Sequence, residues 1–565
     1  MALTWKLTEG KLDGAAMEDW LIATAADATP AESYAAEELR RWLEASTGRE
    51  WQIAASGQEG AAQVRLLADA GLGEEEFRVE VERHGITIAG GRPRGVLYGM
   101  YQLLEDGLGV RFLTWDHTHV PTGMSIPCGT CHYAPKLSFR WSFYRENAER
   151  PEFAARLRVN TITDEERLGG KTGQNLINHS VDMLVPFGKH GQEHPEYYAL
   201  VDGERDGDTR GGGPQLCVTN PKVVEIAAAA AIEHLNVHPE LQNISVSQAD
   251  TDRYCRCPAC EEVNQREGTP MGSQLEFVNA VAERIEKVHP EVKVGTLAYW
   301  YTRKAPKTVR PRRNIQIQLC SIECCTLHAI DDATCVKNQE FCRDMEEWSA
   351  ICDDIWIWNY NTNFRSYDLP FPNLRSIDGN VKYFLRNHAK GAFMQANGNG
   401  LTGELSDLRN YVIGRMLWDP EADGQELCRE FVELHYREAA GKISEYLELL
   451  HDNAETRGVH PACFPKPEEV GLDADLARRG LGHFERALGL ATCDEVRARV
   501  EKASISAHKA MIATEGWQDD GEREALIDRY VTLCRRYGMT HASENGLFDD
   551  YVEELTRVRQ GATDG

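Results

Sequence analysis

Hydrophobic and polar positions follow two different periods in the first quarter of this chain. Over residues 31–48 the apolar positions recur at helical spacing, which predicts an amphipathic helix. Residues 77–91 alternate with a period of two around a central turn, which predicts a β-hairpin. A second helix and a short return strand are expected over 93–113. Residues 1–130 therefore predict a small N-terminal α/β domain.

From residue 131 the pattern changes to strand, loop and helix in repetition. Eight short hydrophobic segments have the length of buried strands, and helical patterns separate most of them. Parallel strands that alternate with helices predict a (β/α)8 barrel of the TIM type over residues 131–420. The eight predicted strands are LSFRWSFY (137–144), VNTITD (159–164), HSVDMLVP (179–186), ISVS (244–247), VKVGTLAYWYT (292–302), IQIQLCSIECC (315–325), DIWIWNYNTNF (354–364) and GAFMQANGNG (391–400).

After residue 420 the pattern is helical almost throughout. The run from Gly424 to Glu455 predicts one long helix with a break at a glycine, and three further helices follow it. Residues 421–565 therefore predict an α-helical C-terminal domain. Long helices without a full core of their own often bury a face against a partner, so we expect a homodimer.

Composition narrows the classes of partner. The chain has 62 basic and 89 acidic residues, a formal net charge of −27, which argues against nucleic acid or an anionic membrane as partner. No apolar run of the sequence is long enough to span a membrane. The opening stretch MALTWKLTEG lacks the basic-then-apolar pattern of a signal peptide, so we expect a cytoplasmic protein.

Polar and aromatic side chains collect where the predicted strands end, which is where barrel enzymes hold their active sites. Aromatic rings suit the flat faces of a sugar, and amides or carboxylates suit its hydroxyls, so an oligosaccharide is the expected partner. For each side chain taken alone, ordinary packing is the competing interpretation. The candidate sugar-binding residues are His190, His194, Tyr197, Asn220, Gln248, Trp300, Tyr301, Arg303, Trp358, Asn359, Tyr360, Asn361, Gln395 and Asn397.

Three carboxylates at predicted strand ends are candidate catalytic residues: Asp250, Glu323 and Glu404. Glycoside hydrolysis needs two, one to protonate the leaving oxygen and one to activate water or attack the sugar. We expect Asp250 to be the general acid, and Glu323, or failing that Glu404, to position the water. Because the pair comes from different strands, inversion is favoured. Arg303, in the basic run 303–313, would bind a substrate carboxylate, although a solvated loop explains that run equally well.

The cysteines are a second signal. Cys255, Cys257 and Cys260 form a CxCxxC pattern, which is incomplete as a zinc motif because structural zinc takes four ligands. A cysteine at the end of another predicted strand would complete the site, and the candidates are Cys320, Cys324 and Cys325. A structural zinc ion, free thiols and a disulfide all remain open at this point, and catalysis itself calls for no cofactor.

Two sets of residues resemble known families. The run EEFRVEVERHGITIAGGRPRGVLYGMYQLLEDGLGVRFL resembles the small domain that precedes the barrel in α-glucuronidases and β-N-acetylhexosaminidases. SVSQAD with YCRCPAC, then TLAYWYTRKAPKTVRPR, LCSIECC, IWNYNTNF and GELSDLRNYVIGRMLWDP, resemble in this order a bacterial family known as domain of unknown function 4838. Members of that family look like relatives of α-glucuronidases and are often found with carbohydrate-degrading enzymes.

The resemblance implies an exo-acting glycoside hydrolase that removes a terminal sugar, a uronic acid or an N-acetylated sugar, from an oligosaccharide. The hexosaminidases that use the substrate's acetamide carry an Asp-Glu pair after the fourth strand, and this chain has Ala249-Asp250-Thr251 there. The α-glucuronidase arrangement therefore fits better. The alternative is a carbohydrate-binding or scaffold protein that keeps the barrel without turnover, since only the enzyme needs paired carboxylates.

Overall fold

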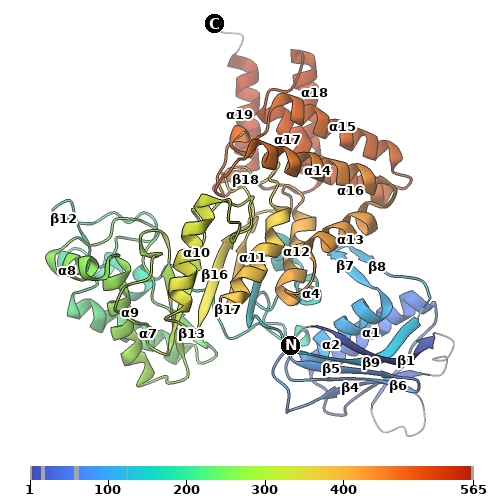
Figure 1. Ribbon diagram of the computed structural model, residues 1–565, viewed down its shortest axis with the longest axis horizontal. Helices are drawn as coiled ribbons and strands as arrows, with labels where there is room; N and C mark the ends of the chain where they lie inside the picture. Colours follow the sequence, from blue (N-terminus) through green and yellow to red (C-terminus); the bar gives the residue numbers. More distant parts are fainter. Residues whose placement is uncertain (1–2, 14–19, 56–62, 124, 562–565) are drawn as a thin grey trace. The chain divides into compact units, whose positions relative to one another are not determined.

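The structure is a computed structural model that describes residues 3–13, 20–55, 63–123 and 125–561 (Figure 1). The chain forms two compact units, and each is described here by itself. Unit 1 comprises residues 1–171, 362–381 and 395–565, and unit 2 comprises residues 172–361 and 382–394. The division into three domains that the sequence predicts stays a prediction.

Unit 1 begins, within its described residues, with a seven-stranded mixed sheet in the order β1-β9-β5-β6-β4-β2-β3 (Figure 1). The predicted hairpin is confirmed, because β5 and β6 pair antiparallel and their buried and exposed side chains alternate. Helices α1 and α2 pack on this sheet. The bounds are β1 Trp5–Asp13, β2 Leu21–Thr24, α1 Pro30–Thr47, β3 Ile53–Ala55, β4 Gln63–Ala68, β5 Phe77–Glu82, β6 Gly85–Gly90, α2 Gly95–Gln102 and β9 Ser125–Tyr133.

Helix α1 begins and ends where the sequence predicts. Thr29 accepts a hydrogen bond from the Glu32 amide while the Glu32 side chain accepts one from the Thr29 amide, which satisfies two backbone donors at once. At the other end Gly48 has φ +70°, a left-handed conformation that glycine adopts without a steric penalty. The buried face of the helix includes Leu39 and Leu43, as its apolar spacing predicts.

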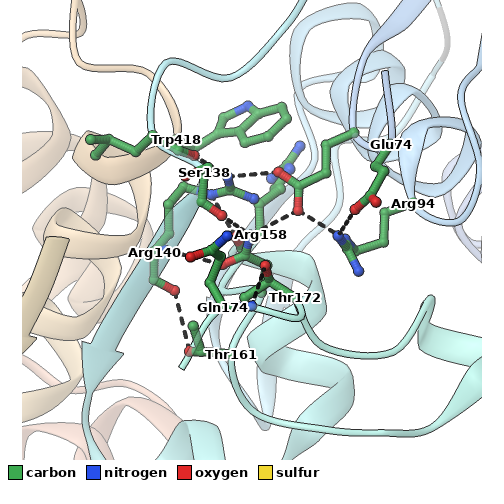
Figure 2. Close-up of polar contacts among 12 residues, drawn as sticks. Glu74, Arg94, Ser138, Arg140, Arg158, Thr161, Thr172, Gln174 and Trp418 are labelled. Atoms are coloured by element: carbon green, nitrogen blue, oxygen red, sulfur yellow. Dashed lines mark hydrogen bonds and ion pairs between the residues drawn. The ribbon is translucent and has the colours of Figure 1, made fainter. Parts of the chain in front are cut away.

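Unit 1 also contains a buried cluster of arginines and glutamates (Figure 2). Glu75 forms ion pairs with Arg94 at 2.8 Å and Arg140 at 2.7 Å. Burial raises the pKa of Glu75, but Arg140 and Arg94 outweigh this and bring the pKa below its ordinary value. Arg140 and Arg158 also lie 5.4 and 5.3 Å from the ring of Trp418. The charges are paired and bound to aromatic faces, so the cluster is a structural element of unit 1.

Helices fill most of residues 421–561, as the sequence predicts, and a further helix precedes them at 406–418. The break in the long helix falls at residues 437–439, where Arg437 has φ +49°, and Gly441 lies inside the next helix. In the part of the chain that the structure describes, no helix combines the length and the apolar character needed to cross a membrane. The bounds are η2 Leu103–Gly107, β7 Arg111–Thr114, β8 His117–His119, β10 Phe139–Phe143, α3 Arg145–Glu149, α4 Pro151–Arg156, η3 Glu166–Leu168, α12 Ser406–Trp418, α13 Gly424–Tyr436, η6 Arg437–Ala439, α14 Ala440–Arg457, η7 Pro467–Val470, α15 Ala474–Leu490, α16 Asp494–Ala503, α17 Ile505–Ala513, α18 Asp520–Arg536, β18 His541–Ser543, β19 Gly546–Leu547 and α19 Phe548–Gly561.

Unit 2 contains a parallel half-barrel sheet in which β13, β14, β15 and β16 pair in sequence, with β17 beside β16. Its amphipathic helices cover the apolar face of the sheet. The bounds are α5 Val181–Leu184, α6 Phe187–His190, η4 Pro195–Tyr197, β11 Leu200–Val201, β12 Glu204–Arg205, α7 Pro221–Val237, β13 Asn243–Ser245, α8 Pro258–Glu267, α9 Met271–Glu286, β14 Lys293–Ala298, η5 Trp300–Thr302, β15 Ile315–Cys320, α10 Val336–Ser349 and β16 Ile355–Tyr360, while α11 Leu374–Arg386 and β17 Ala389–Gln395 carry residues of both units.

Strand β15 shows how the sequence divides the two faces of this sheet. Ile315, Ile317 and Leu319 belong to the apolar core that the helices cover. Successive side chains of a strand point to opposite faces, so Gln318 and Cys320 lie on the other face. This face of the strand therefore carries the polar side chains of Gln316 and Gln318.

Two of the eight predicted strands are wrong. Residues 159–164 and 179–186 contain irregular backbone, bends and the short helix α5, and no strand. Next to β13 the chain from 174 to 180 forms hydrogen bonds with side chains in place of a backbone ladder. The Asn175 amide donates to Asn243 Oδ1 at 2.6 Å and the Asn178 amide to Ser245 Oγ at 3.0 Å. Polar side chains on β13 therefore hold an irregular segment where the sequence predicts a strand.

Candidate functional site

The carboxyl ends of β13, β14 and β15 bring three polar side chains of unit 2 together. Asp250 follows β13, Tyr299 follows β14 and Glu323 follows β15. The Tyr299 hydroxyl donates a hydrogen bond to Asp250 Oδ1 at 3.1 Å. Because parallel strands end at the same edge of a sheet, residues far apart in sequence meet here.

The charges of Asp250 and Glu323 affect the same two side chains, those of Tyr299 and Cys320. Burial raises the pKa of Tyr299 far above its ordinary value, and the negative charges of Asp250 and Glu323 add to this effect. The pKa of Cys320 is likewise raised, first by burial and then by Glu323 and Asp250. Tyr299 is therefore a neutral hydrogen-bond donor to Asp250, and Cys320 is an unreactive thiol.

A network of backbone and side-chain hydrogen bonds holds Asp250. Its amide donates to the carbonyl of Gly211 at 2.7 Å, in a close approach that a Cβ on Gly211 would block at 2.3 Å from the Asp250 carbonyl oxygen. Gln215 bonds the backbone on both sides, at Ala249 and Thr251. His179 Nε2 lies 3.8 Å from Asp250 Oδ1. The carboxylate is thus fixed while its side chain stays 51% exposed.

Glu323 is oriented by Arg303. The guanidinium of Arg303 contacts Glu323 Oε2 at 2.9 Å and Asp344 Oδ2 at 2.6 Å. The side chain of Glu323 is 40% exposed, whereas those of Arg303 and Asp344 are each 13% exposed. Arg303 was predicted to bind a substrate carboxylate, and in the structure it already binds two carboxylates of the protein.

Trp300 presents an exposed ring beside these residues. Its side chain is 45% exposed and its ring centroid lies 6.1 Å from that of Tyr299. Trp300 has φ +54°, a conformation that is costly for a bulky residue and that clusters at functional sites. On the same strand ends Tyr301 stacks on Tyr254 at 4.8 Å, and Gln248 donates to Thr302 Oγ1 at 2.7 Å.

The other predicted sugar-binding residues of unit 2 have partners of their own. Rings pack on rings: Trp358 lies 6.3 Å from Tyr360, and His194 and His190 lie 4.6 and 6.1 Å from Tyr197. The amides serve the backbone or neighbouring side chains: Asn220 caps α7, Asn359 donates to Ser321 at 3.0 Å and Asn361 donates to the Asn359 carbonyl at 3.3 Å. Their role in binding a sugar stays a prediction.

Three predicted site residues belong to unit 1. Gln395 donates to Glu544 at 3.3 Å, and Asn397 donates to the Thr402 carbonyl at 2.9 Å. Glu404 is buried in an ion pair with Arg409. Burial raises the pKa of Glu404 above its ordinary value, although Arg409 opposes the shift. A carboxylate paired in this way suits a structural role in unit 1, and its catalytic role stays a prediction.

A second cluster lies in unit 2 and contains four cysteines. The sulfur atoms of Cys217, Cys255, Cys257 and Cys260 all lie within 4.8 Å of one another, and all four residues are buried free thiols. Cys217 is the fourth member, in place of the cysteines at 320, 324 and 325 that the sequence interpretation considered. Cys320 instead is the last residue of β15, three residues before Glu323.

Sequence reasoning missed several residues of these two clusters. Tyr299 and His179 contact Asp250, yet an aromatic residue at a strand end and a lone histidine carry no spacing signal. Cys217 lies 38 residues before Cys255, in the run LCVTNP, and helix α7, strand β13 and the Asp250 loop separate the two in sequence. The signal available for Cys217 was the incomplete CxCxxC pattern, which calls for a fourth ligand.

Comparisons with known proteins place the chain in a family. Residues 17–111 match glycosyl hydrolase family 20, domain 2, and no curated protein matches the chain. Similar solved structures include the Flavobacterium johnsoniae chitobiase (12% identity, TM-score 0.47, 99% of this chain and 98% of that chain), a β-N-acetylhexosaminidase from Bacteroides fragilis (10%, 0.43, 74% and 89%) and the Streptomyces plicatus N-acetyl-β-hexosaminidase (12%, 0.42, 76% and 94%). Residues 112–448, more than half of the chain, match a domain of unknown function, and the chain belongs to this family, DUF4838.

Proposed function

We propose that this protein is an exo-acting glycoside hydrolase with its catalytic carboxylates on unit 2. The observation that carries the proposal is that Asp250, Tyr299 and Glu323 follow three consecutive strands, where the Tyr299 hydroxyl bonds Asp250 and the charge of Glu323 acts on Tyr299. Both carboxylates are partly exposed and reach solvent, as residues that meet a substrate must. The match of residues 17–111 to a glycosyl hydrolase domain supports the same class of function.

The proposed reaction uses the two carboxyl groups in the same step. Asp250 donates its proton to the glycosidic oxygen as the bond between that oxygen and the anomeric carbon breaks. Glu323 accepts a proton from a water molecule, and the water oxygen forms the new bond to the anomeric carbon. Attack from the face opposite the leaving group gives inversion, and the separate strand origins of the two residues support this stereochemistry. Tyr299 fixes the orientation of Asp250, and Arg303 fixes that of Glu323.

The substrate proposed is a terminal sugar that stacks on Trp300, either a uronic acid or an N-acetylated sugar. The α-glucuronidase-like arrangement of acid and base remains the proposed mechanism, because Ala249-Asp250-Thr251 replaces the Asp-Glu pair of acetamide-assisted enzymes. The carboxylates around Arg303 affect which charge the sugar can carry. Asp344 and Glu323 already bind this cation, and Glu340 lies 3.9 Å from it, which disfavours an anionic sugar at this position.

We also propose that unit 2 contributes half of a (β/α)8 barrel. Four parallel strands with covering helices are the repeating part of that fold. The segment 174–180, which lies along β13, would take the place of a neighbouring strand. A catalytic pair at the carboxyl ends of such strands agrees with where barrel enzymes carry out chemistry.

The test is a screen of aryl glycosides and of uronic-acid and N-acetylhexosamine oligosaccharides, followed by Asp250→Asn. On the substrate found, this variant should lose at least about a hundredfold in kcat while it still binds, the usual range for lost acid catalysis. Asp252→Asn, a change in the same loop, is the matched control and should retain turnover. Near-normal turnover of Asp250→Asn would reject the assignment and make Asp252 the next candidate.

The competing function is a carbohydrate-binding protein without turnover. The exposed ring of Trp300 would serve it equally well. Sugars that bind in calorimetry, with no product released from any of them by the wild-type chain, would favour this function over hydrolysis.

A further inference from the structure

We infer that Cys217, Cys255, Cys257 and Cys260 bind one structural zinc ion in unit 2. Four cysteine thiolates are one of the closed ligand sets of structural zinc, and this chain supplies them from two segments of sequence, one at Cys217 and one at 255–260. Nothing in the proposed hydrolysis uses these residues, so the inference stands apart from the proposed function.

The spacing of the sulfur atoms fits a tetrahedron. Zinc–sulfur bonds of about 2.3 Å place two ligand sulfurs about 3.8 Å apart. Cys217 Sγ lies 3.7 Å from Cys257 Sγ, and all four sulfurs lie within 4.8 Å of one another. A disulfide would need two of them at about 2.05 Å, and all four are free.

The surroundings match those of a ligand set held for a metal. The Leu200 amide donates to Cys255 Sγ at 3.3 Å, and Thr219 Oγ1 lies 3.2 Å from Cys260 Sγ. Such partners orient the ligands of a metal site. The four cysteines form a small buried cluster with Ala199, against which only partly buried apolar residues pack. Apolar burial of this size gives little stabilisation by itself, whereas a bound zinc would join the segments firmly.

The proposed zinc site would join the loop that carries Asp250 to the segment that contains Gln215 and Cys217. Cys217 follows Gln215, which bonds the backbone on both sides of Asp250. Cys255 and Cys257 follow the same loop at its other end, and the Arg256 amide between them donates to the Leu200 carbonyl at 2.8 Å. Zinc bound by these cysteines would therefore tie the end of the Asp250 loop to the segment whose side chains already bond this loop.

Metal analysis of the wild-type chain, purified in reducing buffer without added metal, is the first test. Inductively coupled plasma mass spectrometry should find about one zinc per chain, as a single closed four-cysteine site requires. After exchange into cobalt, the visible spectrum should show the intense bands of tetrahedral thiolate-bound Co²⁺. Zinc below about a tenth of the protein concentration, or iron in its place, would overturn the inference.

Variants of single cysteines test which residues bind the zinc ion. Cys217→Ser should lower both the zinc content and the cobalt spectrum by at least about tenfold, because the fourth ligand is lost. Cys352→Ser removes another buried cysteine of unit 2 outside the cluster, and should retain one zinc. If Cys217→Ser does not fold, the wild-type chain still decides the matter: release of zinc on alkylation should consume four thiols for each ion. Full zinc content in folded Cys217→Ser would overturn the assignment of the ligands.

Discussion

Removal of one hydroxyl group tests the central contact of the proposed active site. Tyr299→Phe deletes the donor to Asp250 and leaves the ring, with its contacts to His179 and Trp300, in place. Tyr299 is only 9% exposed, so its ring packing should hold the variant in the native fold. Loss of activity would then report on the hydrogen bond and not on the packing.

The size of the effect follows from the contact. In the proposed role Asp250 carries its proton, and a hydrogen bond between neutral groups contributes about 0.5–1.5 kcal/mol. The Asp250 side chain is 51% exposed, so water can replace part of what the tyrosine supplies, and a value of about 1 kcal/mol applies. About 1 kcal/mol corresponds to a factor of about five in rate. We expect kcat to fall about fivefold, with KM changed by less than about threefold, because the contact orients the acid and does not bind the sugar.

The assay is steady-state hydrolysis of the substrate that the screen identifies, with Tyr254→Phe as the matched control. Tyr254 stacks on Tyr301 in the same region. If Tyr299 acts through Asp250, its substitution should cost little more in an Asp250→Asn background, so the two effects should not add. A kcat of Tyr299→Phe within twofold of wild type, or fully additive losses in the double variant, would refute the reasoning.

Three further outcomes can be measured. Trp300→Ala should raise KM up to about tenfold with little change in kcat or melting temperature, because the exposed ring contributes stacking alone. Burial, with Asp407 adding, raises the pKa of Glu146 to about 7. The folded state then holds a proton that the unfolded state releases near pH 4.5, so the free energy of unfolding should fall by up to about 3 kcal/mol as pH rises through this window. Urea unfolding at several pH values should show this fall in the wild type and a flatter curve in Glu146→Gln. Glu75→Gln should lower the free energy of unfolding by about 3–5 kcal/mol, because it leaves the buried Arg140 without a full counter-charge.

Local signals were enough to predict much of the fold. Helix α1 has a capping box and a terminal glycine within its own sequence, and the β5–β6 hairpin has its alternation and its turn. The strands β14, β15 and β16 are short, largely buried segments rich in apolar residues, and each is confirmed. Residues 179–186 misled the prediction because Val181, Leu184 and Val185 are apolar and buried, and a short buried helix shares this composition with a strand.

The site was predictable only in part, for a related reason. Asp250 and Glu323 stand at strand ends, which a periodicity argument can locate. Arg303 binds Glu323 and Asp344. Asp344 lies in helix α10, which begins more than thirty residues after Arg303. Contacts of this kind follow from tertiary packing, and residue type at a strand end cannot distinguish a ligand-binding arginine from one that is already paired.

The position of Asp250 explains why the proposed hydrolysis would depend on the long polar loop that precedes α7. Strand β13 is three residues long and ends at Ser245, five residues before Asp250. A catalytic carboxylate must be held within about 0.5 Å of its working position, and a loop beyond so short a strand is not rigid enough by itself. Gly211 and Gln215 bond this loop directly, and Cys217 follows them at the proposed zinc site. The long polar loop before α7 would therefore support Asp250, the proposed general acid. Its contacts reach the Asp250 loop from two sides.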